Sequence, residues 1–85
     1  MNDTSNNWTN KDRTMALFSL RFRHDLNEDK SVKSHAQPYF NEWVERYNNG
    51  IDNVKSRADA NTLRAVQTIE KAEEYLTLTE FMKGE

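Results

Sequence analysis

Hydrophobic residues recur at helical spacing in the first third of the chain. The members of this stripe are three, four and four positions apart: Met15, Phe18, Phe22 and Leu26. This spacing places them on one face of a helix. Thr9 precedes the stripe and has Asp12 three residues later, a pattern close to a capping box. We therefore expect a helix that begins at Thr9 or Asn10.

A second interpretation of two segments gives an alternative fold. Residues 16–23 and 75–81 alternate apolar and polar side chains, which is the period of a β-strand. The two segments could pair as antiparallel strands with the helices packed on one face, an α+β arrangement. The cap at Thr9 and the helix-favouring sequence of residues 15–17 favour helix for the first segment.

The middle of the chain has the clearest periodicity. Its apolar positions form one helical stripe: Tyr39, Phe40, Trp43, Val44, Tyr47, Ile51 and Val54. A capping-box pattern over residues 34–37 and the following Pro38 predict the start of this helix. Residues 48–50, Asn-Asn-Gly, predict its end, with a new helix beginning near Asp52.

The last third predicts one more helix, which opens at Asp59 as N-cap. Its stripe is narrow and rich in alanine: Ala65, Ile69, Ala72 and Leu76. We therefore expect an all-α fold, a small three-helix domain over residues 9–85. Residues 1–8 are polar and are expected to form a flexible N-terminal tail.

The composition makes this domain lean. Only 35% of its 85 residues are hydrophobic, against roughly 45–50% in an average globular domain. A chain of this size gains only about 3–5 kcal/mol from its own core. It has no cysteine, so disulfides cannot help. Its four Phe, two Trp and three Tyr suggest surplus aromatic surface, and we expect a homo-oligomer that buries part of it.

Several function classes are disfavoured by composition and charge. No apolar run approaches the roughly 18 residues that cross a membrane, and the first residues lack the pattern of a signal peptide. We expect a cytoplasmic protein without a membrane partner. Twelve basic and 14 acidic residues give a net charge of −2, which disfavours a salt-driven nucleic-acid binder.

The sequence has no convincing catalytic, metal or cofactor motif. Residues 25–31 match the first oxygen positions of a calcium loop, but Lys30 and Ala36 occupy the positions that need glycine and glutamate. His24 and His35 are interpreted as surface residues, because no nucleophile pattern or substrate pocket accompanies them. Two glycines are too few for a phosphate-binding loop. We expect no enzyme activity, no metal site and no cofactor.

Binding to another protein is the expected function. Tyr39, Trp43 and Tyr47 place three large rings within nine residues, and such rings are frequent in binding hot spots. These three residues are the predicted partner-binding site. The alternative is that the stripe is simply core, which is favoured for Phe40, Trp43 and Val44, while Tyr39 and Tyr47 have hydroxyls that suit a partly wet interface. The size and general type of the chain suggest a regulator, such as a phage-type small inhibitor of a host macromolecular machine.

The alternative function is binding of nucleic acid or a nucleotide. Arg21 and Arg23 flank Phe22, and this combination could supply phosphate contacts and base stacking. Acidic residues that follow in the chain, such as Asp25, dilute the positive field there.

Overall fold

The computed structural model describes residues 8–83 of the chain. These residues form five α-helices, two short 3₁₀ turns and no strand: α1 (Asn10–Arg21), η1 (Arg23–Asp25), η2 (Ser34–Ala36), α2 (Gln37–Asn48), α3 (Ile51–Arg57), α4 (Ala60–Ala72) and α5 (Leu78–Lys83). The predicted all-α class is confirmed, whereas the predicted count of three helices is wrong. None of the helices in this range is both long and apolar enough to cross a membrane.

The first helix begins where its sequence predicts. The Thr9 hydroxyl accepts a hydrogen bond from the backbone N–H of Asp12 at 3.1 Å, and the Asp12 carboxylate accepts one from the backbone N–H of Thr9 at 3.0 Å. This reciprocal capping box satisfies two N–H groups that have no partner within the helix. The helix continues to Arg21, so the alternative strand over residues 16–23 is wrong.

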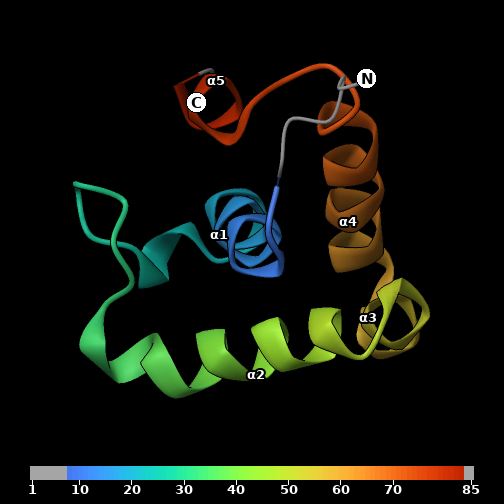
Figure 1. Ribbon diagram of the computed structural model, residues 1–85. Helices are drawn as coiled ribbons and strands as arrows, with labels where there is room; N and C mark the ends of the chain where they lie inside the picture. Colours follow the sequence, from blue (N-terminus) through green and yellow to red (C-terminus); the bar gives the residue numbers. More distant parts are fainter. Residues whose placement is uncertain (1–7, 84–85) are drawn as a thin grey trace.

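The alternation in residues 16–23 has a structural explanation, because α1 lies at the centre of the molecule. Figure 1 shows α1 end-on, with α2, α4 and α5 arranged around it on three sides. Ala16, Leu17 and Phe18 are consecutive and fully buried, so they face different neighbours. The polar residues Thr14 and Ser19 are also buried, and their hydroxyls donate to helix carbonyls.

The alternative strand over residues 75–81 is also wrong. Thr77 caps a short helix there, because its hydroxyl accepts from the backbone N–H of Glu80 at 3.1 Å. The Glu80 carboxylate in turn accepts from the backbone N–H of Thr77 at 2.8 Å. This second capping box starts α5 and adds a helix that periodicity did not predict.

The stop after α2 is confirmed. Gly50 has a φ of +112°, a conformation that residues with a Cβ rarely adopt, and α3 begins at the next residue. The predicted cap at Ser34 is not formed: Ser34 opens η2, and Ala36 precedes α2 without a side-chain cap. The predicted N-cap of α4 is confirmed, since Asp59 accepts from the backbone N–H of Thr62 at 2.8 Å.

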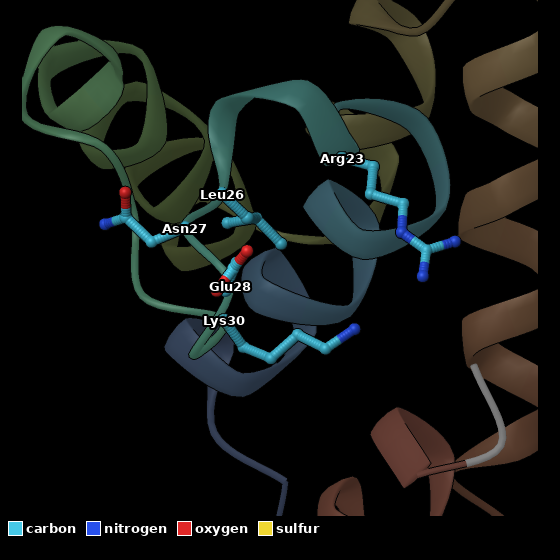
Figure 2. Close-up of a pocket in the computed structure, with 5 residues that line it drawn as sticks. All are labelled: Arg23, Leu26, Asn27, Glu28 and Lys30. Atoms are coloured by element: carbon cyan, nitrogen blue, oxygen red, sulfur yellow. The ribbon is translucent and has the colours of Figure 1, made fainter.

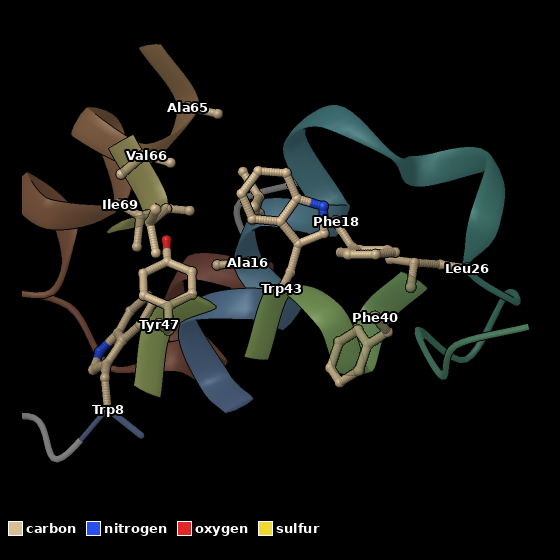
Figure 3. Packing of buried hydrophobic residues seen from close by; sticks show 12 residues of the cluster. Trp8, Ala16, Phe18, Leu26, Phe40, Trp43, Tyr47, Ala65, Val66 and Ile69 are labelled. Carbon is tan, nitrogen blue, oxygen red and sulfur yellow. The ribbon is translucent and has the colours of Figure 1, made fainter. Parts of the chain in front are cut away.

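The core is formed where α1 packs against α2 and α4, and Val54 of α3 belongs to the same cluster. Figure 3 shows the rings of Phe18, Phe40 and Trp43 packed together, with Tyr47 directed toward Ile69 of α4. On the outside of the core, Arg13 of α1 makes a forked hydrogen bond with the carboxylate of Glu73, at 2.9–3.1 Å. This ion pair joins the start of α1 to the end of α4.

Trp8 fastens α5 to the rest of the domain. Residues 1–7 of the predicted tail lie outside the described residues, but Trp8 is only 7% exposed. Its indole N–H donates to the backbone carbonyl of Leu76 at 2.8 Å. Its ring also meets that of Phe81 edge-on, with centroids 5.7 Å apart. Trp8, the last residue of the predicted tail, is therefore part of the core.

Candidate protein-binding surface

The structure separates the three aromatic residues that were predicted to bind a partner. Trp43 is 3% exposed and Tyr47 is 5% exposed, whereas Tyr39 is 39% exposed. The periodic stripe therefore forms the core side of α2, with Tyr39 at its outer edge. Of the three, only Tyr39 is placed to contact another protein in this conformation.

Trp43 is covered by side chains from its own helix and from α1. Its ring lies 6.3 Å from the ring of Phe22 and 6.2 Å from that of Tyr39. The guanidinium of Arg46 stacks over it at 4.5 Å and also donates to the Glu42 carboxylate at 2.6 Å. The surplus aromatic surface inferred from composition is largely buried within the chain.

Tyr47 lies at the floor of a polar hollow of about 310 Å³ between α1, α3 and α4. Burial raises the pKa of Tyr47, so the phenol stays protonated at neutral pH. The hollow also contains Arg13 and Glu73, and their hydrogen bond raises the pKa of Arg13. Arg13 and Glu73 are paired with each other, and Glu70, which also lines the hollow, is paired with Lys55 at 3.2 Å, so each charged residue of the hollow already has a partner.

The two arginines predicted for nucleic-acid contact lie in different surroundings. Arg21 donates to the hydroxyl of Thr62 at 3.3 Å and bridges α1 to α4. Arg23 lines a shallow hollow beside the loop that follows η1, and Figure 2 shows the Glu28 carboxylate in the same hollow. A carboxylate at this position opposes a phosphate group.

The calcium-like segment is closed by its own hydrogen bonds. Asp29 accepts from the backbone N–H and the hydroxyl of Ser31, at 3.0 Å and 2.6 Å. Asn27 also donates to that hydroxyl at 2.9 Å, so the three side chains stabilise a tight turn. Within residues 8–83 there is no group of three or more His, Asp or Glu residues that could hold a metal ion.

Both histidines approach one carboxylate, which the sequence did not indicate. His35 Nε2 lies 3.3 Å from Asp25 Oδ1, and His24 Nε2 lies 3.7 Å from Asp25 Oδ2. The two imidazoles are largely exposed, and the group they share is a carboxylate rather than a nucleophilic hydroxyl. The arrangement links η1 to η2 across the loop.

An apolar groove that the sequence did not predict lies between α1, α5 and the loop after η1. It has a volume of about 430 Å³, and its apolar lining residues, which we call its floor, are Met15, Leu78 and Met82. Its polar lining residues, which we call its rim, are Lys30, Thr79 and Lys83. The groove depends on α5 as a helix, so the missed capping pattern of Thr77 and Glu80 is the sequence signal that could have led to it.

Comparisons with protein-family models, with curated proteins and with solved structures each find no match.

Proposed function

We propose that this chain is a non-catalytic protein-binding modulator. The observation that supports the proposal is the groove between α1 and α5, where apolar side chains of two helices meet at the surface. Its side chains come from segments more than 60 positions apart, Met15 and residues 78–83, so only the folded domain presents it.

The chemistry of the groove suits a macromolecular partner. Methionine side chains are flexible and polarizable, and surfaces rich in them adapt to the apolar face of a partner helix. A small-molecule site usually encloses about 70–90% of its ligand. This groove is open to solvent, which a long protein segment tolerates better than a small ligand does.

The predicted aromatic contact is reduced to one residue in this proposal. Tyr39 is exposed next to Phe22, and it could add a second contact on the opposite side of α1 from α5. Trp43 and Tyr47 act through the stability of α2 instead, because both are buried.

Partner capture with matched variants tests the proposal. Immobilised full-length chain is incubated with extract of its native source, and retained proteins are identified by mass spectrometry. Met82→Asp places a charge in the groove and is expected to reduce capture of the true partner by about tenfold or more, since desolvating a carboxylate is costly. Ile51→Asp is the control, because Ile51 is an exposed apolar residue of α3 outside the groove.

The result against the proposal is equally specific. If folded Met82→Asp retains every partner that the wild-type chain retains, the groove is not the binding surface. A loss caused by Tyr39→Ala instead would move the surface to the aromatic edge of α2.

Self-association and a cytoplasmic location complete the proposal. The composition suggested a homo-oligomer, yet the chain buries most of its aromatic stripe without a second copy. Light scattering at two concentrations tests self-association, and a concentration-independent monomer mass would contradict it. Fluorescence microscopy of the tagged full-length chain in its native source tests the location.

Nucleic-acid binding is the second candidate, and one observation favours it. Arg21 and Arg64 line the same shallow hollow between α1 and α4. Binding through them would weaken with salt and would be lost in Arg21→Ala/Arg64→Ala. Affinity that is insensitive to salt would exclude this candidate.

A further inference from the structure

We propose that the groove between α1 and α5 receives an amphipathic helix that carries acidic side chains on both sides of its apolar stripe. This inference rests on the proposed protein-binding function and specifies the partner. It is carried by the combination of an apolar floor and two lysines at the rim.

The rim of the groove is positively charged although the whole chain is acidic. Lys30 comes from the loop after η1 and Lys83 from the last turn of α5. Among residues 8–83, no carboxylate lies within ion-pair distance of either ammonium group. A carboxylate of a partner could therefore pair with each of them without displacing an existing contact.

The backbone at Lys30 supports a role for its side chain. Lys30 has a φ of +74°, the left-handed conformation that glycine and asparagine adopt most easily. A lysine adopts it at a cost, and conformations of this kind are often associated with binding sites. Figure 2 shows the Lys30 side chain extending away from the loop after η1, and Lys30 lines the same groove as Leu78 and Met82 of α5.

The floor of the groove indicates a helix as the occupant. Met15, Leu78 and Met82 form an apolar strip between two helices, and such a strip accepts side chains at positions i, i+3, i+4 and i+7 of a third helix. A strand would need an open sheet edge, and residues 8–83 contain no strand. An acidic residue on each side of the partner's stripe would face Lys30 and Lys83.

Selection from a random peptide library tests the proposal while the natural partner is still unidentified. Peptides of about 16 residues, roughly four helical turns, are displayed and selected on the full-length chain. The expected peptides combine Leu, Met or Phe at helical spacing with Asp or Glu beside them. In NMR spectra of the isotope-labelled chain, binding of these peptides is expected to shift the resonances of Met15, Leu78 and Met82.

Charge variants test the role of the two lysines. Lys30→Asn and Lys83→Gln are each expected to weaken binding of a selected peptide about two- to fivefold, the effect of one exposed ion pair. Lys71→Gln is the matched control, because it removes the same charge from α4 outside the groove. Circular dichroism confirms that each variant is folded, and added salt is expected to reduce the difference between variant and wild type.

Several outcomes would overturn the proposal. The library could yield basic or uncharged peptides, or no binding peptide at all. The double variant Lys30→Asn/Lys83→Gln could bind a selected peptide as tightly as the wild type. Finally, the chain could form a dimer that Met82→Asp dissociates. The first three leave the proposed function intact if Met82→Asp still abolishes partner capture. If Met82→Asp leaves partner capture unchanged, the groove is not the binding surface and the proposed function loses its support.

Discussion

Lys30 has a backbone conformation that a lysine adopts only at a cost in stability. Its φ of +74° lets the chain turn between Leu26 and Val32, which form an isolated antiparallel bridge. The hydrogen bonds of Asn27, Asp29 and Ser31 hold this turn closed. The turn therefore imposes the left-handed conformation on whichever residue occupies position 30.

Replacing Lys30 by asparagine should stabilise the fold. Asparagine adopts the left-handed conformation more easily than lysine, so Lys30→Asn is expected to raise the free energy of unfolding by about 0.5–1 kcal/mol. Urea denaturation followed by circular dichroism measures this change. Lys30→Ala is the control, because alanine retains the conformational cost, and an equal gain in both variants would contradict the explanation.

Asp59 gives the fold a defined dependence on pH. Hydrogen bonds from Thr62 hold the pKa of Asp59 below its ordinary value of 3.8. A carboxylate with a lowered folded-state pKa stabilises the fold above its unfolded pKa, and this contribution disappears as the pH falls through the folded value. The sensitive range therefore begins near pH 3.8 and extends below it.

Asp59→Asn should remove this part of the pH dependence. Asparagine also caps helices but does not titrate in this range. Between neutral pH and pH values below 3.8, the variant is expected to lose less stability than the wild type, as measured by urea midpoints. Identical pH profiles for the two proteins would show that the cap does not contribute through its charge.

At the scale of elements, α5 is the shortest α-helix among residues 8–83. It has six residues, none of them fully buried, and it is fixed by the Thr77–Glu80 capping box and by Trp8. A helix this short is unstable in isolation, so its stability comes from these contacts. The groove exists only while α5 is formed, which links the cap to the proposed binding surface.

Thr77→Ala should loosen α5 without unfolding the domain. Loss of a threonine N-cap costs about 1 kcal/mol, and here that cost falls on one short helix. Amide hydrogens of residues 78–83 are expected to exchange faster in hydrogen-exchange mass spectrometry, while α1 and α4 keep their protection. Thr79→Ala is the matched control, because Thr79 lies in the same helix and is not the residue that caps it.

At the scale of the whole molecule, α1 serves as the centre on which the other helices pack. The side chain of Phe18 in α1 is fully buried, and its ring centroid lies 5.1–5.9 Å from the ring centroids of Phe22, Tyr39 and Phe40. A helix with neighbours on three sides uses apolar residues efficiently, because most of its surface packs against the rest of the chain. This arrangement explains how a chain that is only 35% hydrophobic forms a core.

Phe18→Ala should unfold most of the domain. Removing a buried phenylalanine costs about 3–5 kcal/mol, which is comparable with the roughly 3–5 kcal/mol that a core of this size supplies. Circular dichroism at about 25 °C is expected to show loss of most helical signal. Tyr39→Ala removes a partly exposed ring of the same cluster, and this variant should remain folded. If both variants unfold, the buried fraction of a ring does not decide how much it contributes to stability.

Local signals along the chain were sufficient for much of the fold. The capping residues Thr9 and Asp59 and the stop at Gly50 all act through groups within four positions, so their effects can be predicted without tertiary contacts. The capping box of Thr77 and Glu80 is equally local. It favours a helix over the strand that the alternative fold placed at residues 75–81.

The candidate surface was less accessible to prediction. A helical stripe identifies which residues of α2 share a face, but it does not say how much of that face the rest of the chain covers. Trp43 and Tyr47 became core because α1 and α4 pack against them, while Tyr39 at the edge stayed exposed. The alternation in residues 16–23 indicated a strand as the alternative for the same reason, because α1 has neighbours on several sides and therefore buries residues all around it.

The sequence by itself favoured the all-α class over the α+β alternative through its helical periodicity. It determined the start of the first helix, the break at Gly50 and the cap of α4, because each depends on short-range hydrogen bonds or on a backbone angle. Tertiary structure alone decided that α1 is central, that Trp8 belongs to the core, and that Met15 and Met82 share one groove with Lys30. Those outcomes depend on contacts between residues far apart in the chain. Only the packed arrangement of the helices brings such residues together.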